Sequence, residues 1–190
     1  MLDFYTEDLI KTLNKTIITK GSVEMSYAEG MKSIIDIFTE KKKAGYKVYF
    51  IGNGGSAAIA SHMTADFMKN GGMNTVSLYD NAVTTCMGND YGYQDIFSRP
   101  LGFLASQGDL LVAISSSGKS QNIINSIDVA RGKDVSTISF TGFDKDNQAR
   151  CGSDLSVYVP SHKYGIVESI HNLIIQEIVD LIMERDGVSL

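Results

Sequence analysis

The pattern of apolar and polar positions divides the chain into a helical start and a longer part in which strands and helices alternate. Over the first 45 residues, apolar side chains recur at helical spacing in two runs, from Leu9 to Ile17 and from Met25 to Phe38. Between them, Lys20-Gly21-Ser22 combines a glycine that stops one helix with a serine that caps the next. The pattern therefore predicts two helices before any strand.

After Gly45 the chain changes to short apolar runs that end near glycine, which is typical of buried strands. We predict strands near 47–51, 74–79, 109–114, 135–140 and 154–159, helices near 56–69, 119–131 and 163–185, and shorter helical turns over 81–104. Strands that alternate with helices form a mostly parallel sheet covered on both faces. The prediction is an α/β domain over residues 46–190 with a five-stranded, flavodoxin-like three-layer sheet, preceded by a helical extension over residues 1–45.

Composition and charge narrow the function classes. A length of 190 residues fits one domain, and the formal net charge of −5 disfavours binding to a nucleic-acid backbone. No apolar run is long enough for a membrane span, and the N-terminus has acidic residues where a secretory signal needs basic ones. Cys86 and Cys151 lack the spacing of a disulfide framework or a zinc knuckle. We expect a cytoplasmic protein with no nucleic-acid or membrane partner.

A glycine-rich loop, Gly52-Asn53-Gly54-Gly55-Ser56-Ala57, follows the first predicted strand and opens a helix. Backbone N–H groups at such a junction bind anions or polyols, and glycine allows the ligand to approach closely. A tight turn without a ligand is the plainer interpretation. The loop also fits the dinucleotide pattern G-x-G-x-x-A, with Asp80 downstream. The helical start argues against a nicotinamide cofactor, because dinucleotide-binding folds usually begin with this strand.

A serine-rich loop, Ser115-Ser116-Ser117-Gly118-Lys119-Ser120, follows the third predicted strand and leads into another helix. Several hydroxyls and unpaired N–H groups together suit a phosphate monoester. One serine is explained by helix capping, but four are not. The fragment GKS suggests an ATP-binding loop, but Ala113 stands where that motif requires glycine.

Four segments, GNGGSAA, MGNDYGYQDIFSR (87–99), GDLLVAISSSGKSQNI (108–123) and TGFD (141–144), resemble in order the phosphoheptose isomerase family of sugar isomerase (SIS) domains, over about residues 45–185. The resemblance implies a phosphorylated sugar substrate, conversion of sedoheptulose 7-phosphate to the aldose heptose 7-phosphate for surface glycans, and a homotetramer supported by the leading helices. It also implies substrate-binding residues: Asn53, Gly54, Gly55, Ser56, Asn89 and Asp90 for the sugar, and Ser115, Ser116, Ser117 and Ser120 for the phosphate.

Isomerisation through an enediolate needs a base at carbon and an acid at the neighbouring oxygens. Two pairs at helical spacing are candidates for catalysis, His62 with Asp66 and Glu168 with His171. By resemblance, the family has Glu at the position of Asp66, Gln at that of Glu168 and a second His at that of Gln176. Either Glu168 or Asp66 is then the base, with His62 or His171 as the proton donor. No cofactor is required; if zinc is bound, His62, Asp66 and Glu168 are its ligands.

Each candidate also has a plainer interpretation. His62 and His171 could be packing residues, Asp66 a solvated charge, and Glu168 the partner of a lysine such as Lys163. The altered active centre leaves a second function open: a non-catalytic phosphosugar-binding protein, or a partner of the replication initiator, since the same family contains such a homotetrameric protein.

Overall fold

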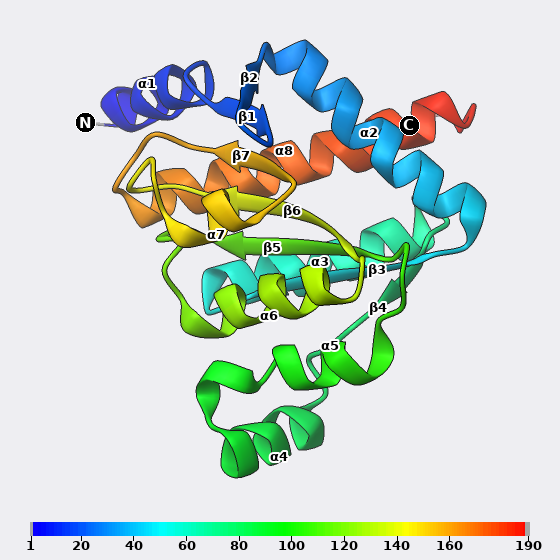
Figure 1. Cartoon of the computed structure of the whole chain (residues 1–190). Helices are drawn as coiled ribbons and strands as arrows, with labels where there is room; N and C mark the ends of the chain where they lie inside the picture. The colour runs from blue at the N-terminus through cyan, green and yellow to red at the C-terminus, as the bar shows by residue number, and fades with distance from the viewer. Residues whose placement is uncertain (1, 189–190) are drawn as a thin grey trace.

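The computed structural model describes residues 2–188, with side chains from Phe4 onward, and is built around one seven-stranded sheet (Figure 1). The strands are β1 (Ile17–Lys20), β2 (Val23–Met25), β3 (Lys47–Gly52), β4 (Asn74–Val76), β5 (Leu110–Ser115), β6 (Ser136–Thr141) and β7 (Leu155–Tyr158). The helices are α1 (Leu2–Leu13), α2 (Tyr27–Ala44), α3 (Gly55–Lys69), α4 (Asn81–Tyr91), the 3-10 turn η1 (Tyr93–Asp95), α5 (Ser98–Leu104), α6 (Gln121–Gly132), α7 (Gln148–Gly152) and α8 (Tyr164–Arg185).

The sheet order is β2-β1-β7-β6-β5-β3-β4, and the five strands from β7 to β4 are parallel to one another. The predicted α/β three-layer architecture is confirmed, and these five strands match the five that the sequence predicted. The chain passes from β3 to β4 on one side and then to β5 on the other side of β3. Such a reversal opens a crevice at the carboxyl ends of the two central strands, where doubly wound folds bind ligands.

The prediction of five strands is wrong in number, because residues 17–25 form an antiparallel hairpin instead of helix. The segment Thr16-Ile17-Ile18-Thr19 consists of β-branched residues, which favour strands. In β1, Ile18 pairs with Val157 of β7 and is fully buried. The hairpin therefore lengthens the sheet beyond β7.

The second helix begins later than predicted. Its N-cap is Ser26 rather than Ser22, and Ser26 forms a capping box with Glu29. The helix ends at Gly45, whose φ of 72° is readily adopted only by glycine. The predicted boundary between residues 45 and 46 therefore lies at this turn, although the hairpin before it belongs to the same sheet as the strands after it.

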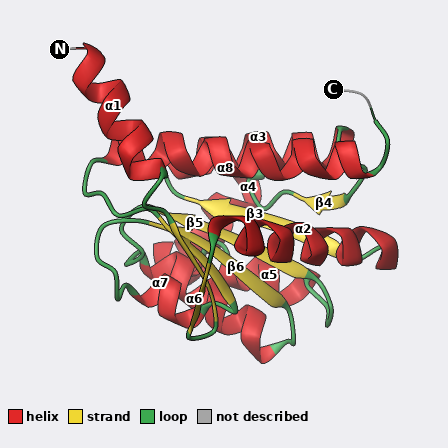
Figure 2. Cartoon of the chain, turned by 90° about the horizontal axis from the view of Figure 1, so that it is seen from above, coloured by secondary structure: helices red, strands yellow, loops and turns green. Residues whose placement is uncertain are grey.

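Helices cover both faces of the sheet (Figure 2). Alternate strand residues point to opposite sides: Phe50 and Val112 pack against α2, α3 and α8, whereas Ile51 and Ala113 pack against α5 and α6. This arrangement explains why β3 and β5 are apolar along most of their length. In contrast, α4 has no buried residue and projects from the sheet (Figure 1). Among the described residues, no helix combines the length and apolar character of a membrane span.

Candidate active site

A cavity of about 210 Å³ lies where the sheet topology predicts a ligand site, at the carboxyl ends of the neighbouring parallel strands β3 and β5. The loops that follow these strands supply most of its wall, and α8 closes one side. The lining residues are Asn53, Gly54, Ser56, Ile114, Ser115, Ser116, Ser117, Ser120 and Tyr164. Seven of the eight residues predicted from the glycine and serine loops are thus brought to one cavity, and Gly55 is the one that does not line it.

The glycine loop is shaped by backbone constraints. Gly54 precedes α3 with φ 56° and ψ −121°, a conformation that a side chain would strain. A Cβ on Gly52 would lie 2.8 Å from the Cβ of Ser56, so the strand and helix pack at close range. The Tyr79 hydroxyl accepts a hydrogen bond from the Gly52 N–H (2.6 Å) and donates one to its carbonyl (2.8 Å). These contacts fix the start of the loop.

The amide of Asn53 is held by a residue that the sequence reasoning missed. Asn53 and Asn122 exchange reciprocal side-chain hydrogen bonds of 2.9 Å. The Tyr93 hydroxyl donates to the side-chain Oδ1 of Asn53, also at 2.9 Å. Asn122 is buried in the first turn of α6, two residues after Ser120. The segment 108–123, which carries the family resemblance, includes Asn122 and was the signal that could have found it.

The serine loop presents hydroxyls of two kinds. Ser115 and Ser117 accept hydrogen bonds from the backbone N–H groups of Gly118 and Lys119. The buried hydroxyl of Ser116 has no partner among the described residues, and Ser120, at the N-cap of α6, makes no side-chain cap bond. Free hydroxyls beside the N-terminus of a twelve-residue helix are suited to binding a phosphate group.

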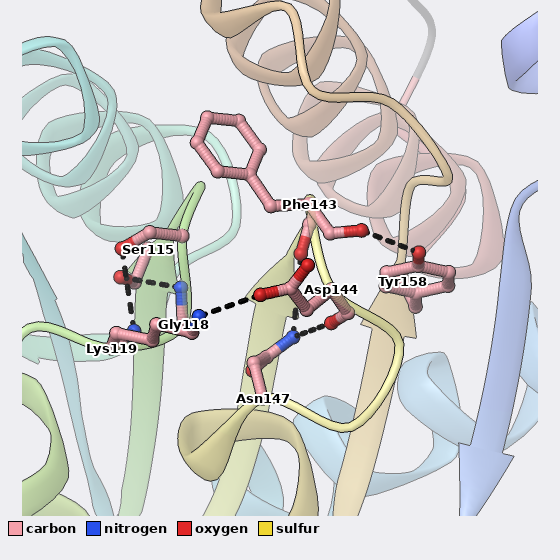
Figure 3. A network of polar contacts seen from close by, with 9 residues as sticks. Ser115, Gly118, Lys119, Phe143, Asp144, Asn147 and Tyr158 are labelled. Carbon is pink, nitrogen blue, oxygen red and sulfur yellow. Dashed lines mark hydrogen bonds and ion pairs between the residues drawn. The ribbon is translucent and has the colours of Figure 1, made fainter.

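A polar network supports the serine loop from the side of β6 (Figure 3). Asn147 is buried and donates to the carbonyls of Gly142 (3.3 Å) and Asp144 (2.8 Å), and a Cβ on Gly118 would overlap its side chain. Lys119 forms a 2.6 Å ion pair with Asp144, and this ammonium holds the pKa of the Asp144 carboxyl below its usual value. The charge of Lys119 is thus directed at Asp144, and the cavity walls are formed by neutral groups.

Glu168 of α8 lies next to the site but is not among the residues that line the cavity. Its carboxylate lies against Gly55 at the start of α3: a Cβ on Gly55 would be 2.7 Å from the Glu168 Cδ. The neighbouring Gly54 lines the cavity, so a carboxylate is placed next to the cavity wall, at the positive end of the α3 dipole. Lys163 does not pair with Glu168 but with Asp8, at 2.7 Å.

The structure separates the other predicted catalytic residues from the cavity. His62 and Asp66 contact each other on α3 (Nε2 to Oδ2, 3.3 Å), with His62 exposed, and neither lines the cavity. His171 is fully buried, with its Nε2 3.1 Å from the Thr141 carbonyl oxygen. Burial lowers the pKa of His171 to about 4, so the ring is neutral near pH 7.

Asn89 and Asp90, predicted to contact the sugar, lie exposed at the end of α4 and hydrogen-bond to each other at 2.8 Å. They do not line the cavity. Tyr164, which does, was missed because it stands outside all four motifs, at the first position of α8.

The donor set does not fit the zinc site considered from the sequence. Within residues 2–188, no group of three or more His, Cys, Asp and Glu residues converges as metal ligands would. His62 and Asp66 form a pair, whereas the Glu168 carboxylate lies against Gly55. We therefore derive no step through a metal ion.

This fold, with a glycine loop and a serine loop facing one cavity, defines a sugar isomerase domain, and the SIS domain family matches residues 14–142 of the chain. Two curated relatives are phosphoheptose isomerases, from Aliarcobacter butzleri (37% identity; 86% of this chain and 89% of the relative) and from Sulfurimonas denitrificans (37%; 97% and 98%). The chain belongs to the phosphoheptose isomerase family, and these relatives indicate that it is an aldose–ketose isomerase.

Solved structures agree with this assignment. The phosphoheptose isomerase of Neisseria gonorrhoeae superposes with a TM-score of 0.81 at 28% identity and covers 95% of this chain and 97% of its own. That of Francisella tularensis has the same fold, with a TM-score of 0.84 at 24% identity and 96% of both chains covered.

Proposed function

We propose that this protein interconverts sedoheptulose 7-phosphate and D-glycero-D-manno-heptose 7-phosphate in the cytoplasm, as a step in making heptose for surface glycans. The observation that carries the proposal is the cavity in which the hydroxyls of Ser116 and Ser120 are free, with the carboxylate of Glu168 next to its wall. Both relatives named above, which align over most of their length, are phosphoheptose isomerases.

In this proposal the serine loop holds the phosphate, and the glycine loop with Asn53 holds the sugar end. Glu168 removes a proton from C1 of the ketose, which produces a 1,2-enediolate, and returns a proton to C2. A proton moves from the oxygen on C1 to the oxygen on C2, so that the aldehyde forms at C1. The proton transfer between the two oxygens is assigned to no side chain of the cavity, because His62 and Asp66, which contact each other on α3, do not line it. His171 is assigned no step, because it is enclosed in the core.

We further propose that the protein is a homotetramer. Large apolar side chains remain exposed on the helices at both ends of the chain, with Phe4 76% and Ile10 52% exposed on α1 and Leu173 42% exposed on α8. Exposed apolar faces of this kind are commonly covered by further copies of a chain.

The function is tested by incubating the purified protein with sedoheptulose 7-phosphate and following the aldose product by NMR, in parallel with added zinc and with a chelator. The proposal expects aldose formation, and Ser120→Ala should raise the KM at least tenfold because a phosphate ligand is removed. Binding of the phosphosugar without any product in all samples would contradict it and favour the non-catalytic binding role.

A further inference from the structure

We propose that Tyr164 is a specificity-determining residue that contacts the sugar part of the ligand rather than its phosphate. This inference rests on the function proposed above and adds a residue outside the four motifs. Tyr164 is the only aromatic side chain among the cavity-lining residues in the described part of the chain. It comes from α8, whereas the other lining residues belong to β5, to the loops after β3 and β5, and to the first turn of α3.

The size of the cavity places Tyr164 beside the sugar. Its volume of about 210 Å³ is below the roughly 300–1,000 Å³ that is typical of ligand pockets. With the phosphate on the serine loop, the rest of a seven-carbon chain must therefore extend along the cavity wall towards solvent. Tyr164 is 59% exposed, and among the side chains described from Phe4 onward its hydroxyl has no hydrogen-bond partner. The ring can pack on the carbon chain while the hydroxyl bonds to a sugar hydroxyl.

An aromatic cluster holds the ring in place although it is exposed. The Phe143 ring meets Tyr164 edge to face, with centroids 4.8 Å apart and an interplanar angle of 70°. The His162 ring stacks on the Phe143 ring, with the ring centroids 5.3 Å apart. Tyr164 therefore packs against the Phe143 ring, which is itself stacked on His162.

Phe143, whose ring contacts Tyr164, has an unusual backbone conformation. Its φ of 57° is unusual for a bulky residue, and such outliers persist only where surrounding contacts impose them. Phe143 N–H donates to the Ser161 carbonyl (3.0 Å), and the Tyr158 hydroxyl donates to the Phe143 carbonyl (2.8 Å). In Figure 3 the Phe143 ring points away from the polar network of Asp144 and Asn147. The strained backbone thus directs the ring towards α8.

The first turn of α8 is also anchored from the N-terminal helix. Lys163 forms its ion pair with Asp8 of α1, and a Cβ on Gly165 would lie 2.6 Å from the Tyr5 hydroxyl. The residues on both sides of Tyr164 are therefore held, and this again favours a defined position for its ring.

The test compares binding of inorganic phosphate, sedoheptulose 7-phosphate, fructose 6-phosphate and ribulose 5-phosphate by isothermal titration calorimetry. Tyr164→Ala should weaken sedoheptulose 7-phosphate binding about tenfold and leave phosphate binding within about twofold, because it removes only sugar contacts. Tyr164→Phe should lose about threefold, and Phe143→Ala should weaken phosphosugar but not phosphate binding. Phe103→Ala is the control, since Phe103 is an exposed aromatic residue (74%) on α5.

An equal loss for phosphate and phosphosugars in Tyr164→Ala would overturn the inference, because Tyr164 would then support only the phosphate site. An unchanged phosphosugar affinity would overturn it as well. Turnover is measured separately on the wild-type protein: its absence contradicts the proposed reaction, while the ratio of phosphosugar to phosphate affinity still decides the role of Tyr164. Wild-type protein that binds none of the three phosphosugars contradicts both proposals.

Discussion

At the scale of single residues, the absence of a side chain at Gly55 allows the carboxylate of Glu168 to reach the cavity wall. Gly55→Ala adds a methyl group that would lie 2.7 Å from the Glu168 Cδ, so the carboxylate must move. A displacement of about 1 Å can reduce the rate on the order of a hundredfold. We expect such a loss in kcat for sedoheptulose 7-phosphate isomerisation, with phosphate affinity little changed.

Gly132→Ala is the matched control for this experiment. Gly132 is the last residue of α6, and a Cβ there would meet nothing within 4 Å. Equal kcat values in the two variants would show that the contact between residue 55 and Glu168 has no part in catalysis.

The same scale shows how far the site could be predicted from the sequence. Asn53 and the four serines follow directly after strands, and strand ends at a topological switch point are brought together by the fold itself. Tyr164 and Asn122 belong to helices, and their positions depend on packing between distant segments. Asn89 and Asp90 belong to α4, which has no buried residue that would fix it against the sheet. Local patterns carry no information on such contacts.

At the scale of secondary structure, the parallel core was predictable and the N-terminal segment was not. β3 and β5 are short apolar runs followed by glycine or serine, and the predicted ends agree with β3, β5, β6 and β7 to within a residue or two. Ile17–Met25 is too short to show whether its apolar residues have a period of two or of 3.6. Its pairing with β7, as between Ile18 and Val157, joins segments far apart in the sequence and decides the outcome.

The attachment of α8 to β6 leads to a prediction about pH. His171 of α8 is bonded to the Thr141 carbonyl of β6 and has a pKa of about 4, against 6.5 when unfolded. The unfolded chain thus binds a proton more readily, so this contribution to stability is present above pH 6.5 and is lost as the pH falls towards 4. Between pH 7 and pH 5 the loss is about 2 kcal/mol.

His171→Gln keeps a donor near Thr141 but cannot titrate. The free energy of unfolding is measured by chemical denaturation at pH 7 and at pH 5. Its decrease between these two pH values should be about 2 kcal/mol smaller in the variant than in the wild type. The same pH dependence in both proteins would mean that folding does not lower the pKa of His171.

At the scale of the whole molecule, the chain joins a neutral phosphate site to a carboxylate from a distant helix. Family membership, fold and cavity agree, whereas Asp66, Glu168 and Gln176 depart from the residues that the resemblance implies. We assign the base to Glu168, because it is the one carboxylate of the predicted catalytic set that lies beside the cavity wall.

The most direct test measures carbon-bound deuterium in sedoheptulose 7-phosphate after incubation in D2O with the wild-type protein and with Glu168→Gln. We expect exchange at C1 and aldose formation with the wild type, and exchange at least a hundredfold slower in the variant, with phosphosugar affinity within about threefold. Exchange at the wild-type rate in Glu168→Gln would contradict the account, because Glu168 would then not be the base.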